Sequence, residues 1–308
     1  MAYPSRGLRI APSAVTAGAH VLVIGDALLD VHAVPREPIV GGADVPAAIA
    51  LQPGGQGANL AVRLARAGVA VRLLTAIADD PAGILLRERL ATEGIELDAV
   101  PTVASGTVVV LRDATGERTM LSQRPPLAAA AADRLRSAPP DGGWVICSGY
   151  ALAEPDADAL PGVLRGSARL AIAGCALADA DVAAWRQRVT DAAPDLLLLN
   201  HGEATALDPI PPVILLAVTD AGGATLTLGG EDLRAAVPPG PPAVDATGAG
   251  DAFAAALVGS LLADETWPPA ADRLRSALAA AVGTAAAVAR VEGAQGRVPG
   301  EPAATLRP

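Results

Sequence analysis

The sequence predicts an α/β protein in which a mostly parallel central sheet carries helices on both faces. A chain of 308 residues that is 51% hydrophobic and 18% charged can bury one large core. Short, continuous apolar runs recur along the chain and alternate with segments of helical periodicity. Such runs are typical of strands buried on both faces, and their alternation with helices favours parallel pairing.

The first part of the chain supplies two of these strands and two helices. VLVIG, residues 21–25, is the first strand, and VRLLTAI, residues 71–77, is another. Between them, the Gly-rich turn at 53–57 begins a helix that continues to residue 67. DPAGILLRERLATEG, residues 80–94, has helical periodicity, with acidic residues early and a glycine at its end.

Four further apolar runs continue the predicted sheet, and helical segments separate them. They are WVICSG (144–149), RLAIAG (169–174), DLLLLN (195–200) and VILLAVT (213–219). The proline-rich stretch PPGPPAV, residues 238–244, is expected to be a loop that leads into a glycine-rich motif.

Two regions carry strand patterns without helices, and we expect their strands to form a small separate sheet. These strands fall within about 31–52 and 95–122, where TVVVLRD and ERTMLS flank a turn. The sheet would form a lid over one end of the main sheet; ordinary surface hairpins are the alternative. A small sheet cannot bury both faces alone, so we expect a homodimer formed through the lid.

The composition excludes several classes of function. A net charge of −10 and a pI near 4.8 argue against nucleic acid as a partner. All 23 basic residues are arginine. Without lysine, the chain has no lysine-dependent phosphate loop and no Schiff-base chemistry. Any bound phosphate must therefore rely on backbone amides, arginine or a metal ion.

The cysteines, the histidines and the apolar segments argue against further classes of function. Cys147 and Cys175 are in apolar surroundings and have no zinc-binding spacing, and the three histidines are scattered. No G-x-S-x-G elbow is present. Residues 1–20 are expected to form a loose N-terminal tail, and the Ala-rich run 278–291 is too short to span a membrane. These features predict a soluble, cytoplasmic protein without a membrane partner.

The stretch VDATGAGDAF, residues 244–253, is the most informative in the chain. Two acids, Asp245 and Asp251, flank a Gly-Ala-Gly turn just before a long helical run. One interpretation is a tight turn with an aspartate at the helix start. The other is an anion site, because successive N–H groups at a helix N-terminus suit a phosphate and Asp251 beside them can act as a base.

Polar residues at the ends of the predicted strands suggest a pocket around this motif. Ligands of open parallel sheets bind beyond the carboxyl ends of the strands. Asp30, Asn200, Glu203 and Thr219 all follow apolar runs, and GGQGAN, residues 54–59, is a second glycine-rich turn. Each has a structural alternative, such as a helix cap for Asn200. Together they describe one anion-binding half and one half that recognises hydroxyl groups.

GGQGAN near the N-terminus and DATGAGD near the C-terminus resemble the two signatures of the ribokinase-like (phosphofructokinase B) carbohydrate kinases. Further motifs of the family stand between or after these two signatures, in the family's order, from about residue 21 to 299. They are ADDPAG, GERT, SGY, Asn200-x-x-Glu203 and a late GAQ at 293–295. The resemblance implies one kinase domain over 21–299 with the ribokinase-like fold: a mostly parallel central sheet, helices on both faces and a small β-sheet lid. It implies ATP-dependent transfer of the γ-phosphate to a hydroxyl of a small sugar.

The resemblance also implies residue roles. Asp251 would be the general base, and the amides of Gly248, Ala249 and Gly250 would stabilise charge on the transferred group. The implied sugar-binding residues are Asp30, Gly54, Gly55, Gln56 and Asn59. The implied nucleotide-binding residues are Asn200, Thr219, Gly222, Gly250 and Val282. Glu203 would help hold Mg²⁺ through water, and Asp245, Thr247 and Gly293 would surround a monovalent cation such as K⁺.

Departures from the family pattern leave the substrate open. Gln56 stands where ribokinases often have lysine, and SQRPPL, residues 122–127, replaces a small loop expected near the sugar. A nucleoside kinase is one alternative, although few aromatic residues are present to stack a base. If Arg124 points inward, a sugar acid or sugar phosphate is another. A dinucleotide oxidoreductase lacks its glycine motif after the first strand. A non-catalytic sensor is disfavoured by the presence of Asp251.

Overall fold

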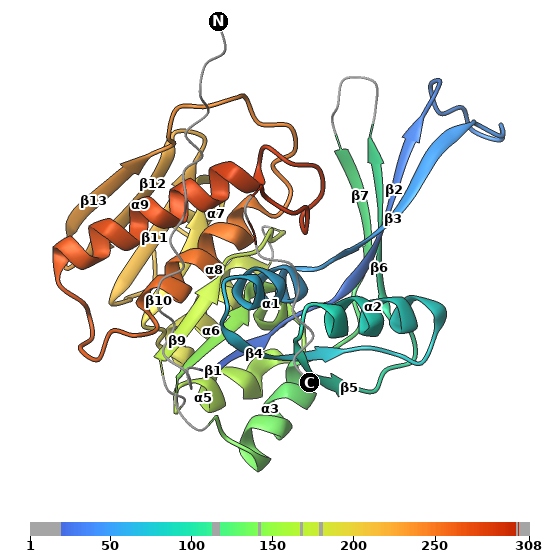
Figure 1. Ribbon diagram of the computed structural model, residues 1–308. Coiled ribbons are helices and arrows are strands. Elements are labelled where there is room, and N and C mark those ends of the chain that lie inside the picture. The colour runs from blue at the N-terminus through green and yellow to red at the C-terminus, as the bar shows by residue number, and fades with distance from the viewer. Residues whose placement is uncertain are drawn as a thin grey trace, which may run out of the picture.

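The computed structural model describes residues 20–112, 118–140, 143–166, 169–178, 181–299 and 301. It contains a nine-stranded sheet with helices on both faces and a four-stranded sheet that projects from one end of it (Figure 1). The N-terminal tail predicted for residues 1–20 falls almost entirely outside the described residues. The predicted α/β class with a small second sheet is confirmed.

The large sheet is parallel over most of its width. Its order is β13-β12-β11-β10-β9-β8-β1-β4-β5, and only the pairs β11–β12 and β12–β13 are antiparallel. The strands are β1 (His20–Ile24), β4 (Ala70–Ala76), β5 (Glu96–Val100), β8 (Trp144–Ser148), β9 (Arg169–Ala173), β10 (Leu196–Asn200), β11 (Leu215–Asp220), β12 (Gly223–Leu228) and β13 (Glu231–Ala236). Parallel pairing aligns their carboxyl ends along one edge, where the site lies.

Apolar side chains on both faces of this sheet form two separate cores. In β1, Val21 and Val23 join one core, while Leu22 and Ile24 join the other, as strand alternation requires. The first face is covered by α1 (Gln56–Arg66), α2 (Pro81–Thr92), α8 (Ala249–Leu261) and α9 (Ala271–Val288). The second is covered by α3 (Ala128–Ser137), α4 (Gly149–Ala153), the 3₁₀ turn η1 (Ala157–Ala159), α5 (Leu160–Leu164), α6 (Val182–Ala192) and α7 (His201–Ala206). Continuous apolar runs arise because both faces are buried.

The small sheet, which we call the lid, stands away from the body at the upper right of Figure 1. It consists of β2 (Leu28–Pro35), β3 (Ala47–Gly54), β6 (Gly106–Arg112) and β7 (Arg118–Gln123), in the order β3-β2-β6-β7. The range 95–122 contributes to both sheets, because β5 pairs with β4 in the large sheet after the α2 crossover. The turn predicted between β6 and β7 lies outside the described residues.

Within the described part of the chain, no helix combines the length and the apolar character needed to cross a bilayer.

Candidate active site

The turn GGQGAN brings the start of α1 against the end of β1. Gly55 has a φ of 92°, and a Cβ there would lie 2.6 Å from the carbonyl oxygen of Asp26. A Cβ at Gly57 would lie 2.5 Å from the carbonyl carbon of Gly25. Both positions require glycine, because any side chain would push the helix away from the strand. This contact places Asn59, one turn into α1, at the edge where the strands end.

The turn DATGAG begins α8 and exposes backbone amides. Gly248 precedes the helix with a φ of 74°, and a Cβ there would lie 2.8 Å from the Cα of Ala294. The N–H of Ala249 donates to the carbonyl of Ala246 at 3.2 Å, so it is engaged in the turn. No hydrogen bond within the described residues uses the N–H of Gly248 or Gly250, and nothing lies within 4 Å of a Cβ built at Gly250. Two of the three predicted amides can therefore receive an anion.

Asp251 stands on the first turn of α8 with its carboxylate turned to α1. The Nδ2 of Asn59 donates to Oδ2 of Asp251 at 2.8 Å. Burial raises the pKa of Asp251 to about 7. The Asn59 hydrogen bond and the charge of Arg63 act to lower that pKa, while the charges of Asp26 and Glu203 act to raise it. A carboxylate with a pKa near neutrality suits a general base.

Asp30 reaches the same region from the lid. It lies on β2, and a Cβ at Gly54 on the neighbouring strand would collide with its carboxylate, which explains the glycine. Burial raises the pKa of Asp30 to about 6; Asp26 also raises it and Arg124 lowers it. Among the described residues no hydrogen bond engages the Asp30 oxygens, so they are available to ligand hydroxyl groups.

Gln56 lies at the start of α1, between this helix and the large sheet. Its Nε2 donates to the carbonyl of Gly174 at 2.7 Å, and its Oε1 accepts from Ser148 Oγ at 2.5 Å. The amide thus ties α1 to the ends of β8 and β9. The substrate-binding role of Gln56 stays a prediction.

Asn200 and Glu203 form a capping box at the start of α7. The Asn200 side chain accepts from the N–H of Glu203 at 2.9 Å, and Glu203 Oε2 accepts from the N–H of Asn200 at 2.8 Å. Burial raises the pKa of Glu203, and the bond from Asn200 opposes that rise. Thr219 is next to Asn200 in the register of β10 and β11, so all three lie at the same edge of the sheet. Their contact with nucleotide or Mg²⁺ stays a prediction.

Two predicted nucleotide-binding residues have their contacts within the protein. The N–H of Gly222 donates to Oδ1 of Asp220 at 2.6 Å, because Asp220 closes the turn between β11 and β12. Val282 is 3% exposed, since its position on α9 faces the core between that helix and the sheet. The nucleotide-binding role of both residues stays a prediction.

Asp245 fixes the loop before α8 to the chain around residue 293. It is buried, and it accepts from the N–H of Thr247 at 2.9 Å and from Thr247 Oγ1 at 2.7 Å. Its other oxygen accepts from the N–H of Gly293 at 3.1 Å. These contacts bring together the three residues predicted to surround a monovalent cation; the cation itself stays a prediction.

Asp26, which was not among the predicted site residues, lies in the site and pairs with Arg124. Arg124 Nε donates to Asp26 Oδ2 at 3.0 Å, and the guanidinium lies over the ring of Tyr150, 4.0 Å from its centroid. The acid directly after the first strand, in VLVIGD, was a usable signal for Asp26. Its pairing with a residue 98 positions away in sequence was not readable.

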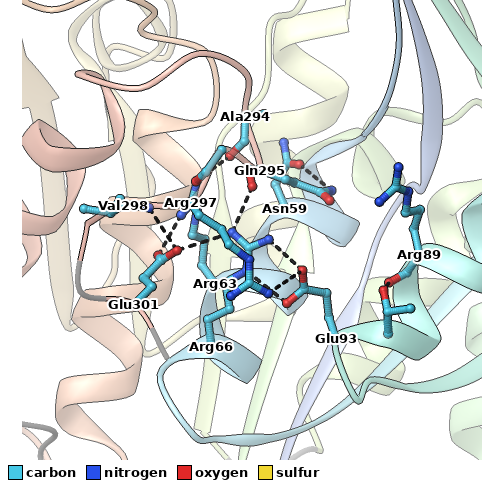
Figure 2. A network of polar contacts seen from close by, with 12 residues as sticks. Asn59, Arg63, Arg66, Arg89, Glu93, Ala294, Gln295, Arg297, Val298 and Glu301 are labelled. Atoms are coloured by element: carbon cyan, nitrogen blue, oxygen red, sulfur yellow. Dashed lines mark hydrogen bonds and ion pairs between the residues drawn. The ribbon is translucent and has the colours of Figure 1, made fainter. Parts of the chain in front are cut away.

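A second missed feature is a polar face on α1. Asn59 and Arg63 are buried, and Arg63 and Arg66 bind the chain around residue 295 (Figure 2). The sequence contains a signal for this polar face. Residues 56, 59, 63 and 66 are all polar and recur at helical spacing on one face.

Comparisons with known proteins identify the family of this chain. The model for the pfkB family carbohydrate kinases matches residues 19–207 and 214–300. No curated protein sequence gives a significant match.

Three solved structures illustrate the similarity in fold. A ribokinase from Giardia lamblia has a TM-score of 0.75 at 18% identity, covering 91% of this chain and 97% of its own. A sugar kinase from Pyrococcus horikoshii in complex with ATP has a TM-score of 0.73 at 21% identity, covering 90% and 95%. A nucleoside kinase from Methanocaldococcus jannaschii has a TM-score of 0.71 at 16% identity, covering 91% and 95%. With the family match extending over most of the sequence, the chain belongs to the pfkB family of carbohydrate kinases and has the ribokinase-like fold.

Proposed function

We propose that the protein is an ATP-dependent kinase that phosphorylates a hydroxyl group of a small, neutral sugar. The observation that carries this proposal is the position of Asp251, a carboxylate with a pKa of about 7 on the first turn of α8, next to the amides of Gly248 and Gly250, which make no hydrogen bond within the described residues. ATP use is supported by the similar sugar kinase from Pyrococcus horikoshii, which is solved in complex with ATP.

Asp251 would accept the proton of the substrate hydroxyl as its oxygen attacks the γ-phosphorus. The new P–O bond forms to the sugar oxygen, while the bond to the β-phosphate oxygen breaks and ADP leaves. The N–H groups of Gly248 and Gly250 would stabilise the charge on the transferred oxygens. This chemistry needs position and fixed dipoles, which explains how a chain without lysine supports it.

Mg²⁺ would neutralise the phosphate charge when bound with ATP. Within the described residues there is no group of three or more His, Cys, Asp or Glu that could hold a metal ion. The half-buried carboxylate of Glu203, at the edge of the sheet beside Asn200, fits a site in which phosphate oxygens and water supply most ligands.

A neutral substrate is favoured by the charges around the site. The negative charge of Asp26 raises the pKa of Asp30, and the charges of Asp26 and Glu203 raise the pKa of Asp251. Arg124, whose charge lowers the pKa of Asp30, already pairs with Asp26. A cavity of about 160 Å³ next to this pair is lined by Asp26, Arg124, Glu154 and Asp156, so it carries more negative than positive charge. A sugar acid or sugar phosphate would meet net repulsion there.

A nucleoside is less favoured because the aromatic side chain at this cavity is already covered. Tyr150 lines it, but the Arg124 guanidinium lies on its ring. The one phenylalanine, Phe253, is 2% exposed and is part of the core. Neither ring can stack a base in this arrangement.

A panel assay tests the proposed function. Neutral sugars, sugar acids and nucleosides would each be incubated with MgATP, and ADP release would be measured. We expect turnover with at least one neutral sugar. Turnover limited to nucleosides or to acidic substrates would contradict the proposal.

Arg124→Ala tests the assignment of substrate charge. Arg124 forms a partly exposed ion pair with Asp26, and such pairs contribute little. We therefore expect kcat/KM on the neutral sugar to fall by less than about fivefold. The loss on a sugar acid should be no greater. Arg136→Ala, at an exposed ion pair with Asp133, is the matched control. A loss of kcat/KM of more than about tenfold, confined to the acidic substrate, would mean that Arg124 binds the negative charge of the substrate.

We also propose that the lid pairs with a second copy of this chain. On one face of the lid, the strands β3 and β7 expose Ile49 (67%), Leu51 (58%) and Leu121 (59%), and Met120 (65%) is exposed on the opposite face. The sheet has open edges at both strands, and an apolar surface of this kind is typical of an interface. A two-fold partner would cover the face without a second kind of protein.

Light scattering at micromolar concentration should therefore give the mass of a dimer. Leu51→Asp places a charge in the proposed interface, and we expect it to yield monomers. Ile84→Asp, at a side chain 55% exposed on α2, is the control and should leave the mass unchanged. A monomeric parent protein would contradict the dimer.

A further inference from the structure

One face of α1 holds the chain that follows α9 in place. Arg63 Nη2 donates to the carbonyls of Ala294 at 2.7 Å and Gly296 at 2.9 Å, and Arg66 Nη1 donates to the carbonyl of Gln295 at 2.9 Å (Figure 2). Three successive carbonyls are thus bound by two arginines. Since buried charge-assisted hydrogen bonds are among the strongest, the backbone on both sides of Gln295 is fixed.

Acidic residues in turn hold these arginines. Arg63 pairs with Glu301 at 2.9 Å, and Arg66 pairs with Glu93 at 2.6 Å. The Arg63 and Arg66 side chains are only 3% and 6% exposed, so neither can easily swing away into solvent. The network in Figure 2 is therefore a rigid support beneath the site.

The side chain of Gln295 extends from this support to the base through one intermediate. Gln295 Nε2 donates to Asn59 Oδ1 at 3.0 Å, and Asn59 Nδ2 donates to Asp251 Oδ2 at 2.8 Å. An amide has one donor end and one acceptor end. Because Gln295 occupies the oxygen of Asn59, the nitrogen of Asn59 must face Asp251. The opposite orientation would set two oxygens against each other.

We propose that Gln295 is a positioning residue that fixes the amide orientation of Asn59, so that Asn59 donates to Asp251 and keeps that carboxylate ionised for proton abstraction. The catalytic consequence rests on the proposed function. Neither Gln295 nor its backbone needs to contact substrate for this effect.

The charged groups that face Asp251 come from several elements. Asp26, after β1, and Glu203, on α7, raise its pKa, whereas Arg63, on α1, lowers it. A substitution of Gln295 leaves all three in place. It removes only the constraint on Asn59, whose hydrogen bond lowers the pKa of Asp251. Loss of the Gln295 side chain should therefore raise the pKa of Asp251.

Gln295→Met tests this, because methionine has a similar length and no N–H donor. The Asp251 carboxyl would be followed by ¹³C NMR titration of the ligand-free protein, with its signal assigned by Asp251→Asn. We expect the midpoint to rise by about one pH unit, the effect of weakening one charged hydrogen bond. Gln187→Met is the control, because Gln187 Nε2 donates to Asp191 on the exposed face of α6. An unchanged midpoint in Gln295→Met overturns the inference.

The pH dependence of kcat/KM provides a second test of the positioning role. If Asp251 is the base, kcat/KM of Gln295→Met should be about tenfold lower at acidic pH, where more base is protonated, and nearly unchanged at about pH 9. A loss of equal size at every pH would mean a merely structural role and would overturn the inference. If the parent protein phosphorylates no sugar, the proposed function fails, while the NMR titration still decides the inference.

A second variant guards against poor folding of the first. Gln295→Glu keeps the size of the side chain and removes its donor, and its charge adds to the effect on Asp251. We expect its titration midpoint to rise by at least as much as in Gln295→Met. A fall, or no change, would contradict the positioning role.

Discussion

Asp251→Asn should lower kcat by about 10²–10⁴-fold, the usual contribution of a general base. The asparagine amide has nearly the same shape, but it cannot take the proton of the attacking hydroxyl. The KM values for ATP and sugar should change little, because the amides of Gly248 and Gly250 do not depend on the side chain. Steady-state ADP release, with the thermal midpoint as a check on folding, measures this. Near-parental kcat would reduce Asp251 to a helix-capping residue.

The same assignment predicts the pH dependence of the parent enzyme. The base works when ionised, and burial raises the pKa of Asp251 to about 7. We expect kcat/KM to rise with pH and to level off above that value, falling about tenfold per unit on the acid side. A flat profile between about pH 5 and 8 would contradict the role of Asp251.

Arg63→Met should lower the free energy of unfolding by about 3 kcal/mol, the range found when one partner of a buried ion pair is removed. Arg63 is 5% exposed and bonds to Glu301 and to the carbonyls of Ala294 and Gly296, so the variant leaves buried acceptors without donors. Urea unfolding measures the change.

Arg136→Met is the matched control for this loss. Arg136 forms an exposed pair with Asp133, at 51% and 78% side-chain exposure, and its removal should cost less than about 0.5 kcal/mol. Equal destabilisation by the two substitutions would show that the network around Arg63 contributes nothing special to the fold.

Local signals in the sequence were enough to predict the main architecture. Strands buried on both faces leave continuous apolar runs, and glycines mark close backbone approaches, such as that of Gly57 to Gly25. The start of α8 at Ala249, two residues before Asp251, could also be predicted, because the glycine-rich turn that contains Gly248 precedes it. These signals are residue types and spacings within short segments, even where the resulting contact, as between Gly57 and Gly25, joins segments that are distant in sequence.

Contacts between residues far apart in sequence could not be predicted. The amide of Gln56 bonds Ser148 and Gly174, more than 90 positions away in sequence. Val282 lies in the core because of the way α9 packs against the sheet. The same applies to Arg63, whose partner Glu301 is 238 positions away in sequence. No local pattern specifies such pairs.

The direct product of the proposed reaction provides the most decisive measurement. The parent protein and Asp251→Asn would each be incubated with MgATP and the neutral sugar that gives most ADP, and ³¹P NMR would follow the phosphorus signals. The account predicts that the parent converts the γ-phosphate signal into a phosphomonoester coupled to a sugar proton, in equal amount to ADP, and that Asp251→Asn forms almost none. Release of inorganic phosphate in place of the ester, or equal ester formation by Asp251→Asn, would contradict it.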